Sequence, residues 1–228
     1  MGKSKDRRRD NDKQPGIILG GICLDSYSDI PEPYRDYLKI GTNVYIKTGT
    51  ILCGEGFHFS RDDRGTLKFN EHKKGLVIRD NVWIGSNCTI DRGRIRPTVV
   101  GGGTKIDNGV HISHNCRIGR NCILGTGSII LGSVEIGDGS EIWSGAIIHQ
   151  HVKIGKNCAV GAGTYLRKDL PDNTVAYIDN RTGKLVIKPI SETKKYSQKN
   201  TEKNTEKIGR GGSRKSCLNG KCSIDLSW

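Results

Sequence analysis

The sequence is poor in the side chains that usually fill a globular core. Only 34% of its 228 residues are hydrophobic, 6% are aromatic, and there is a single methionine. No apolar run approaches the length of a membrane-spanning helix, and the basic start is not followed by the apolar stretch of a secretory signal. These absences argue against a conventional layered core, a membrane span and export, so the expected location is the cytoplasm.

The formal charge of +13 is concentrated at the two ends of the chain. Residues 1–16 hold six Lys/Arg against three Asp, and residues 191–228 hold nine Lys/Arg against four acidic residues. Both segments are polar, which predicts disordered basic tails, the second of low complexity. Neither offers the structured basic face with interleaved aromatic residues that nucleic-acid binding needs. The sign of the charge fits a modest attraction to an acidic partner such as an acyl carrier protein.

Eight cysteines raise the question of disulfides or bound metal, but their placement favours neither. Four of them share one position of the repeat described below, which predicts packed, reduced thiols: Cys88, Cys116, Cys122 and Cys158. Cys217 and Cys222 lie in the C-terminal tail without the further ligands that a zinc site requires.

What the sequence has in abundance is glycine, with 31 residues, and a branched aliphatic residue at every sixth position. Twelve successive positions follow this rule: Val100, Ile106, Ile112, Ile118, Leu124, Ile130, Ile136, Ile142, Ile148, Ile154, Val160 and Leu166. The residue four places after each is small or medium-sized: Thr104, Val110, Cys116, Cys122, Ser128, Val134, Ser140, Ala146, Val152, Cys158 and Thr164. A period of six fits neither an amphipathic helix nor a two-sided strand.

This period predicts an all-β protein, a left-handed parallel β-helix with three flat sides of one hexapeptide each. The aliphatic residue points inward, the small residue fills the corner, and glycine or a polar residue makes the bend. Three hexapeptides make one turn of 18 residues, and successive turns should lie ~4.8 Å apart. Burial of each aliphatic side chain contributes ~1.5–3 kcal/mol.

The repeat also bounds the parts of the chain. We expect the β-helix over residues 17–171, because shorter sets with the same period precede the long one: Ile40, Ile46 and Leu52, then Ile78, Ile84 and Ile90. Residues 58–76 have no repeat and many charges, so they are predicted to leave the column as an external loop. Residues 172–190 should form short strands that cap the open end.

Two stretches go beyond a generic repeat: GEGFHFSRDDRG followed by VWIGSNCTIDRG, and IDNGVHISHNCRIG. In order and spacing they resemble the UDP-3-O-acyl-glucosamine N-acyltransferase family of lipid A synthesis, over about residues 40–168. The resemblance implies a homotrimer with active sites between neighbouring subunits. It also implies roles for four residues: His114 as general base, the Gly132 amide as oxyanion donor, Asp107 as the residue that orients His114, and His151 as a second active-site histidine.

The spacing supports part of this assignment independently. Gly132 follows His114 by 18 residues, one full turn, and should therefore lie directly above it. His151 is 37 residues on, two turns and one step, so all three fall near one edge of the column. His149 alternates with His151 and shares its face, and Phe57 and His58 begin the external loop, where we expect them to contact the acceptor. His111 is expected to be a surface residue.

The leading hypothesis is an acyltransferase that moves an acyl group from a phosphopantetheine thioester to the amine of a nucleotide-linked amino sugar. The donor, acyl-CoA or an acyl carrier protein, is a co-substrate, and no bound cofactor is predicted. About 40 residues precede the first coil, and we expect no counterpart of that family's N-terminal uridine-binding domain among them. The alternatives are an acetyl-CoA-dependent sugar O- or N-acetyltransferase and a catalytically silent scaffold. No metal is predicted, because the histidine pairs lack the spacing of zinc-dependent hexapeptide carbonic anhydrases.

Overall fold

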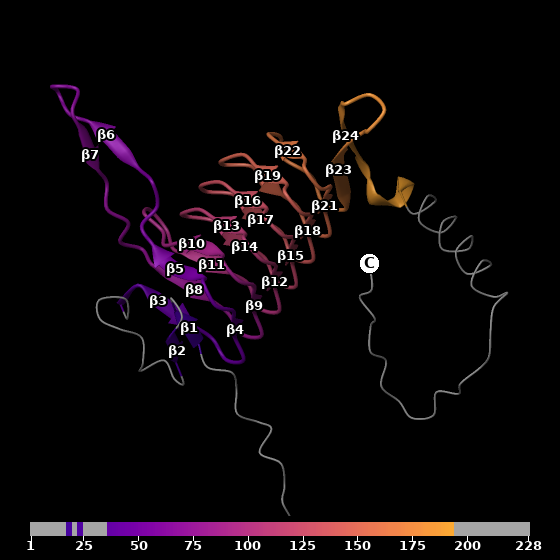
Figure 1. Ribbon diagram of the computed structural model, residues 1–228. Helices are drawn as coiled ribbons and strands as arrows, with labels where there is room; N and C mark the ends of the chain where they lie inside the picture. Colours follow the sequence, from indigo (N-terminus) through magenta and orange to yellow (C-terminus); the bar gives the residue numbers. More distant parts are fainter. Residues whose placement is uncertain (1–16, 20–21, 25–35, 194–228) are drawn as a thin grey trace, which may run out of the picture. The chain divides into compact units, whose positions relative to one another are not determined.

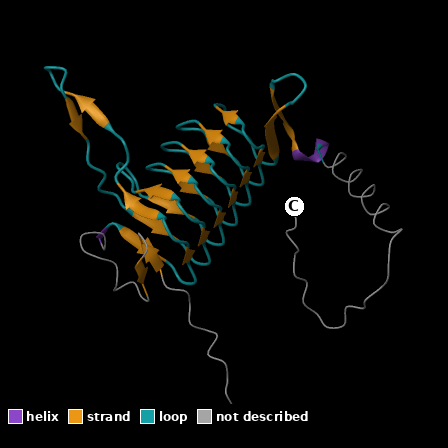
Figure 2. Cartoon of the chain, viewed as in Figure 1, coloured by secondary structure: helices purple, strands orange, loops and turns teal. Residues whose placement is uncertain are grey.

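The structure, a computed structural model, describes residues 17–19, 22–24 and 36–193. The chain divides into two compact units, Met1–Ile190 and Ser191–Trp228. In the first unit, short parallel strands stack into a three-sided column (Figure 1). Nearly all of its regular structure is strand, as Figure 2 shows. The predicted tails, 1–16 and 191–228, lie outside the described residues except for 191–193.

Each wall of the column is one sheet, and the chain visits the three walls in turn. Sheet I contains β3 (Leu38–Ile40), β8 (Leu76–Ile78), β11 (Thr98–Val100), β14 (Arg117–Ile118), β17 (Glu135–Ile136) and β20 (Lys153–Ile154). Sheet II contains β4 (Tyr45–Ile46), β9 (Trp83–Ile84), β12 (Lys105–Ile106), β15 (Ile123–Leu124), β18 (Glu141–Ile142), β21 (Ala159–Val160), β23 (Thr174–Ile178) and β24 (Leu185–Pro189). Sheet III contains β5 (Ile51–Gly54), β10 (Thr89–Asp91), β13 (His111–Ile112), β16 (Ile129–Ile130), β19 (Ile147–Ile148) and β22 (Tyr165–Leu166).

The pairing register repeats every 18 residues in the regular part of the column. Ile112 pairs with Ile130, and Ile130 pairs with Ile148, each in a parallel ladder. The predicted parallel β-helix is therefore confirmed. The external loop is a hairpin of β6 (Phe59–Arg61) and β7 (Leu67–Phe69), which projects from the stack in Figure 1.

Two further strand pairs lie at the ends of the described chain. The predicted cap is formed by β23, which continues sheet II beside β21, and by β24, which pairs antiparallel with β23. Near the other end, β1 (Ile17–Leu19) and β2 (Ile22–Leu24) form an antiparallel pair. A 3-10 turn spans Ile190–Glu192.

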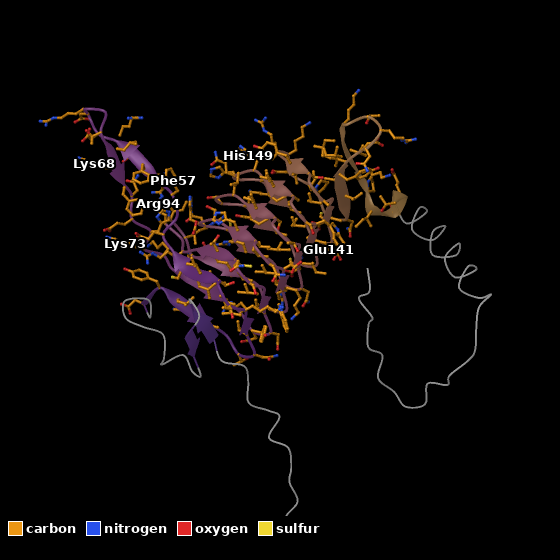
Figure 3. All side chains as sticks on the ribbon, in the orientation of Figure 1. Phe57, Lys68, Lys73, Arg94, Glu141 and His149 are labelled. Carbon is orange, nitrogen blue, oxygen red and sulfur yellow. The ribbon has the colours of Figure 1, made fainter. Side chains whose placement is uncertain are left out.

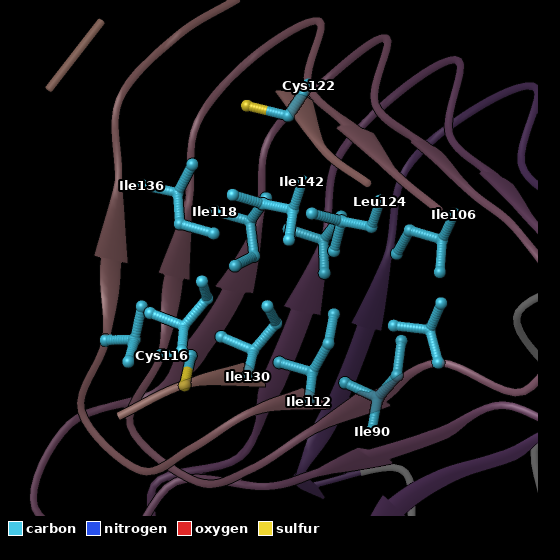
Figure 4. Close-up of a cluster of buried hydrophobic side chains, with 14 of the residues drawn as sticks. Ile90, Ile106, Ile112, Cys116, Ile118, Cys122, Leu124, Ile130, Ile136 and Ile142 are labelled. Atoms are coloured by element: carbon cyan, nitrogen blue, oxygen red, sulfur yellow. The ribbon is translucent and has the colours of Figure 1, made fainter. Parts of the chain in front are cut away.

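The core is a ladder of the repeat's aliphatic residues, all twelve of which are at most 3% exposed. Figure 4 shows successive members stacked along the column. The small corner residues are equally buried. The hydroxyl of Thr104 donates to Gly119 O at 2.8 Å, 15 residues on, whereas the hydroxyls of Ser128 and Thr164 have no hydrogen-bond partner within the described chain. Cys116 Sγ donates to Leu131 O at 3.1 Å. Thr104 and Cys116 are therefore buried with their hydrogen bonds made.

The cysteines of the column are free and buried, as the repeat predicted. Burial raises the pKa of the Cys116 thiol to about 12, so the thiol is protonated and unreactive at neutral pH. Cys53, just before the external loop, is also buried, and its pKa is raised to about 11. Cys217 and Cys222 lie outside the described residues.

The corner between sheets I and II, here called the clamp corner, shows how a regular bend is held. Its third residue has a positive φ and is Asn or Gly, as at Asn121 with φ 52°. A carboxylate from the coil above accepts a backbone N–H from the coil below. Asp138 Oδ1 accepts from Arg120 N at 2.7 Å, and Asp80 Oδ1 accepts from Thr42 N at 2.7 Å. Stacked coils are thus locked together by side-chain oxygens as well as by strands.

Candidate functional site

Both interruptions of the repeat leave the column at one corner, between sheets III and I, here called the site corner. Residues 55–74, here called the arm, follow β5 and carry the β6–β7 hairpin. Residues 92–97, here called the insertion, follow β10. His114 follows β13 at the same corner, one coil further along the column. The topology therefore brings two irregular segments to the residue that the resemblance marks as the base.

His114 and Gly132 are in contact across neighbouring coils. Ser133 N donates to His114 O at 2.9 Å, which sets the vertical register of the corner. A Cβ atom on Gly132 would lie 3.0 Å from Cε1 and 3.2 Å from Nε2 of the His114 ring. The imidazole thus lies against Gly132 because that residue has no side chain. The stacking predicted from the 18-residue spacing is confirmed, while the catalytic roles stay predictions.

Asn115, which the sequence reasoning did not single out, holds this corner together. It is 2% exposed and has φ 61°, a conformation that Asn tolerates well. Its Oδ1 accepts the backbone N–H groups of Arg94 at 2.8 Å and Ile95 at 3.0 Å. Its Nδ2 donates to His114 Nδ1 at 2.8 Å. Because the oxygen faces two backbone donors, the amide orientation is fixed, and neutral His114 carries its own proton on Nε2 in the single chain.

The arm returns to the column with two histidines beside His114. The His58 ring centroid is 6.4 Å from that of His114, and the His72 centroid is 5.0 Å away. His58 was predicted as a contact residue, whereas His72 was missed because no periodicity places a residue within an irregular loop. Gly56 permits the close approach, since a Cβ atom there would lie 2.7 Å from His114 Cδ2 and 3.0 Å from His72 Nε2.

Two of the three arginines of the insertion fix it to its surroundings. Arg92 Nη2 pairs with Glu55 Oε1 at 2.6 Å, and Arg92 Nε donates to His72 O at 2.6 Å. Arg96 Nη1 pairs with Glu135 Oε1 at 2.6 Å. The first pair joins the insertion to the arm, and the second joins it to the column. The insertion, the arm and the column therefore form one hydrogen-bonded unit around His114.

Burial at this corner favours the neutral forms of His114 and His72. Burial, followed by the neighbouring imidazole of His72, lowers the pKa of His114 to about 4. Burial is also the main reason that the pKa of His72 is lowered. A neutral imidazole at pH 7 has a lone pair on one nitrogen and a proton on the other. His114 can therefore accept or donate a proton without first losing one.

The other predicted histidine contacts lie further along the site corner. His151 is exposed and two coils above Asn115, has φ 65°, and donates its backbone N–H to Gly132 O at 3.0 Å. His149 places its ring 6.0 Å from that of Tyr165. The predicted placement of His114, Gly132 and His151 on one edge is thus confirmed. His111 lies on the outer face of sheet III, where its Nδ1 is 2.7 Å from Thr89 Oγ1.

Phe57 stands at the start of the arm and is 89% exposed, with its ring centroid 5.0 Å from that of Phe59. In Figure 3 it is labelled near the base of the arm together with Arg94, while Lys68 is labelled toward the outer end. Its side chain is therefore free to meet another molecule, as a contact residue must be.

Asp107 is not beside His114 within the chain. It follows β12 at the corner between sheets II and III, where Oδ1 accepts from Asn108 N at 2.8 Å and Oδ2 accepts from the Thr126 hydroxyl. The partner of His114 Nδ1 in this chain is Asn115. Successive hexapeptides lie on different walls of the column, so Asp107 and His114, seven residues apart, lie at different corners.

The described residues contain neither a metal-binding cluster nor a membrane-spanning helix. No group of three or more His, Cys, Asp or Glu side chains within them has a geometry that could hold a metal ion. Nor does any helix in that part of the chain have the length and apolar character needed to cross a membrane.

The sequence matches two models of repeat families. Residues 97–132 and 133–168 match the bacterial transferase hexapeptide (six repeats), and residues 75–114 match the hexapeptide repeat of succinyl-transferase. The UDP-3-O-acylglucosamine N-acyltransferase of Ectopseudomonas mendocina is 41% identical over 75 residues, which is 33% of this chain and 21% of that protein. The enzyme of the same name from Rhizobium etli is 45% identical over 69 residues, 30% of this chain and 19% of that protein.

Solved structures show the same column. The UDP-N-acetylglucosamine acyltransferase from Campylobacter jejuni is 26% identical with a TM-score of 0.55, over 68% of this chain and 63% of that one. The corresponding enzyme from Bacteroides fragilis is 24% identical with a TM-score of 0.56, over 67% of this chain and 56% of that one, and supports the fold. The chain thus spans little more than half the length of these structures, and the matched segment is about a fifth of the sequence relatives.

Proposed function

We propose, from the chain's membership of the hexapeptide-repeat transferase family and from the geometry of the site corner, that it is an acyltransferase. It moves an acyl group from a phosphopantetheine thioester, carried by CoA or an acyl carrier protein, to the amine of a nucleotide-linked amino sugar. The observation that carries the proposal is the neutral imidazole of His114 lying against Gly132, one coil above. A scaffold has no use for this arrangement.

The chemistry needs a proton acceptor and an oxyanion donor. The acceptor amine attacks the thioester carbonyl carbon, His114 takes the amine proton, and the negative charge gathers on the carbonyl oxygen. The backbone N–H of Gly132 has no hydrogen-bond partner among the described residues and is available to that oxygen. The attack forms the C–N bond. Collapse of the tetrahedral intermediate restores the carbonyl and breaks the C–S bond, and the released thiolate takes the proton from His114.

A base at Nε2 requires the ring proton on Nδ1, yet the Asn115 amide holds it on Nε2 in the single chain. An acceptor that meets Nδ1 would reverse this preference. Asp107, which the resemblance gives the orienting role, occupies another corner of this chain and could serve His114 only from a neighbouring subunit. We therefore propose that assembly completes the base.

The outer face of sheet III offers a surface for such assembly. Its column of outward side chains is largely apolar: Ile51, Thr89, His111, Ile129, Ile147 and Tyr165. Two of these side chains are exposed in the single chain, Ile51 at 57% and Tyr165 at 47%. We propose that this face packs against other copies in a homotrimer, since an exposed apolar strip on a flat sheet favours association. His149, His151, Phe57 and His58 would then line the cleft between subunits.

Sedimentation analysis tests the assembly. The wild-type chain is expected as a trimer and Ile147→Glu as a monomer, because a buried unpaired charge costs several kcal/mol. Lys153→Glu, on the outer face of sheet I, is the matched control and should stay trimeric. A monomeric wild-type chain, or a trimeric Ile147→Glu variant, would contradict the proposed interface.

A product assay tests the reaction. The chain is incubated with UDP-linked amino sugars and with acyl carrier protein or CoA thioesters of several chain lengths, and products are identified by mass spectrometry. We expect an N-acylated sugar with at least one donor. Transfer from acetyl-CoA alone would favour the sugar acetyltransferase alternative, and the absence of product with every pair would favour the scaffold.

A further inference from the structure

Three nitrogen atoms close to His114 are buried without a hydrogen-bond partner: Nδ1 and Nε2 of His72 and Nε of Arg94. The other buried unpartnered side-chain atoms of the described residues are hydroxyls of the column, Thr98, Ser128 and Thr164. A buried donor left without an acceptor costs about 1–3 kcal/mol. Because a neutral imidazole carries one N–H group, one nitrogen of His72 and Nε of Arg94 are buried donors without an acceptor in the described chain.

Arg94 differs from the two arginines that flank it in the insertion. Arg92 and Arg96 are each paired with a glutamate, whereas the Arg94 guanidinium has no acidic partner among the described residues. Its backbone is nevertheless held in place, because Arg94 N donates to the same Asn115 side chain that contacts His114. Asn115 thus links the backbone of Arg94 to the ring of His114, so the unpaired guanidinium belongs to a residue held next to the proposed base.

His72 is the second donor, and it is directed toward His114. It is 0% exposed, its ring centroid is 5.0 Å from that of His114, and its Nε2 lies close to Gly56, where a Cβ atom would be 3.0 Å away. The carboxylate that acts on His72, Glu55, is already paired with Arg92. The charged groups that act on His114 are all cationic when charged: His72, His58, Arg94 and His151.

We propose that Arg94 and His72 form a subsite for an anionic group, a phosphate or a carboxylate, carried by the amino sugar. Arg94 is partly exposed and makes the first contact, and the buried His72 lies beside His114. A sugar with its amine on the carbon next to a phosphorylated anomeric carbon places the two groups on adjacent atoms of the ring. An amine beside His114 therefore brings the phosphate within reach of Arg94, and a charge-assisted pair with a guanidinium is the strongest contact available.

The subsite rests on the proposed function for the choice of an amino sugar, but its test needs no turnover. Calorimetry of the full chain compares three probes: glucosamine, glucosamine 1-phosphate and glucosaminuronic acid. Hydrogen bonds to charged groups contribute about 1.5–3 kcal/mol. We therefore expect an anionic probe to bind about 10- to 100-fold more tightly than glucosamine. The two anionic probes distinguish a phosphate from a carboxylate.

Variants locate the effect. Arg94→Gln and His72→Phe, the latter keeping an aromatic ring without its nitrogens, should reduce this preference while leaving glucosamine binding unchanged. Arg120→Gln, at the clamp corner, is the matched control and should keep the full preference. Loss of the preference in either site variant supports the subsite. Equal binding of the three probes to the wild-type chain, or a preference intact in both site variants, would overturn it even if the chain proves to be an acyltransferase.

Discussion

The clamp corner and the site corner are built from the same hexapeptide, yet they differ in what their side chains bond. At the clamp corner the polar groups hold one coil to the next, as Asp138 does for the backbone of Arg120. At the site corner, Asn115 instead holds the inserted segment and the His114 ring. Two interruptions of the repeat leave the column there, and none leaves at the clamp corner within the described residues.

The difference shows which corner of the column has polar groups available to bind a ligand. At the clamp corner the carboxylates of Asp138 and Asp80 each accept a backbone N–H group of the neighbouring coil. At the site corner buried nitrogens of His72 and Arg94 have no partner among the described residues. The column supplies rigidity, because its buried ladder fixes each corner, and the insertions supply groups that the repeat cannot place. The buried nitrogens without a partner thus lie at the corner where the period is broken, whereas the buried unpartnered atoms elsewhere in the described column are the hydroxyls of Thr98, Ser128 and Thr164.

Replacing the base gives the largest contrast between the corners. His114→Ala is expected to lower the rate of acyl transfer about 10²- to 10⁴-fold, the range of general acid–base catalysis, without unfolding the column. His114 lies at a bend rather than in the core ladder, so thermal unfolding should change little. Gln150→Ala, two coils above on the same corner, is the control and should keep its activity. An unimpaired His114→Ala enzyme would remove the site corner from the mechanism.

The pH dependence of stability separates the corners by a second route. The pKa of His114 is about 4 in the folded chain and ~6.5 when unfolded, so the folded state binds a proton less readily. Its contribution is complete above pH ~6.5 and is lost as the pH falls toward about 4, by on the order of 1 kcal/mol, because solvent screens the half-buried ring. At the clamp corner, the hydrogen bond from the backbone N–H of Arg120 lowers the pKa of Asp138. The contribution of Asp138 to the stability of the fold is therefore lost only at a lower pH than that of His114.

Urea unfolding of the wild-type chain and of His114→Gln between pH 7 and pH 4.5 measures this effect. The variant should lose less stability on acidification, because it has no imidazole to be protonated on unfolding. Curves with the same pH dependence for both proteins would show that His114 is not buried as a neutral ring.

The repeat made the column and the stacking of His114 on Gly132 predictable, because an 18-residue lap fixes vertical neighbours whatever the side chains are. It also placed the cysteines in the corners and the loop outside the wall. It did not predict His72 or Arg94, since an irregular loop has no period from which a position can be computed. Asn115 was within a quoted motif, but its role depends on Arg94 N and Ile95 N, which only the fold brings to it. Asp107 lies at another corner of this chain, so its orienting role stays a prediction that depends on a neighbouring subunit.

A matched pair of glycine substitutions makes the comparison between corners most direct. A Cβ atom on Gly119, at the clamp corner, would lie 2.6 Å from Asp138 N, which is backbone and cannot move aside. Gly119→Ala should therefore destabilise the chain by about 1–3 kcal/mol in urea unfolding. A Cβ atom on Gly132 would meet the side chain of His114 at 3.0 Å, and a ring can shift by a few tenths of an ångström. Gly132→Ala should thus keep its stability and lose about tenfold in transfer rate, since displacement of a catalytic group is costly. The two corners would prove equivalent if both variants lost stability and activity in the same proportion.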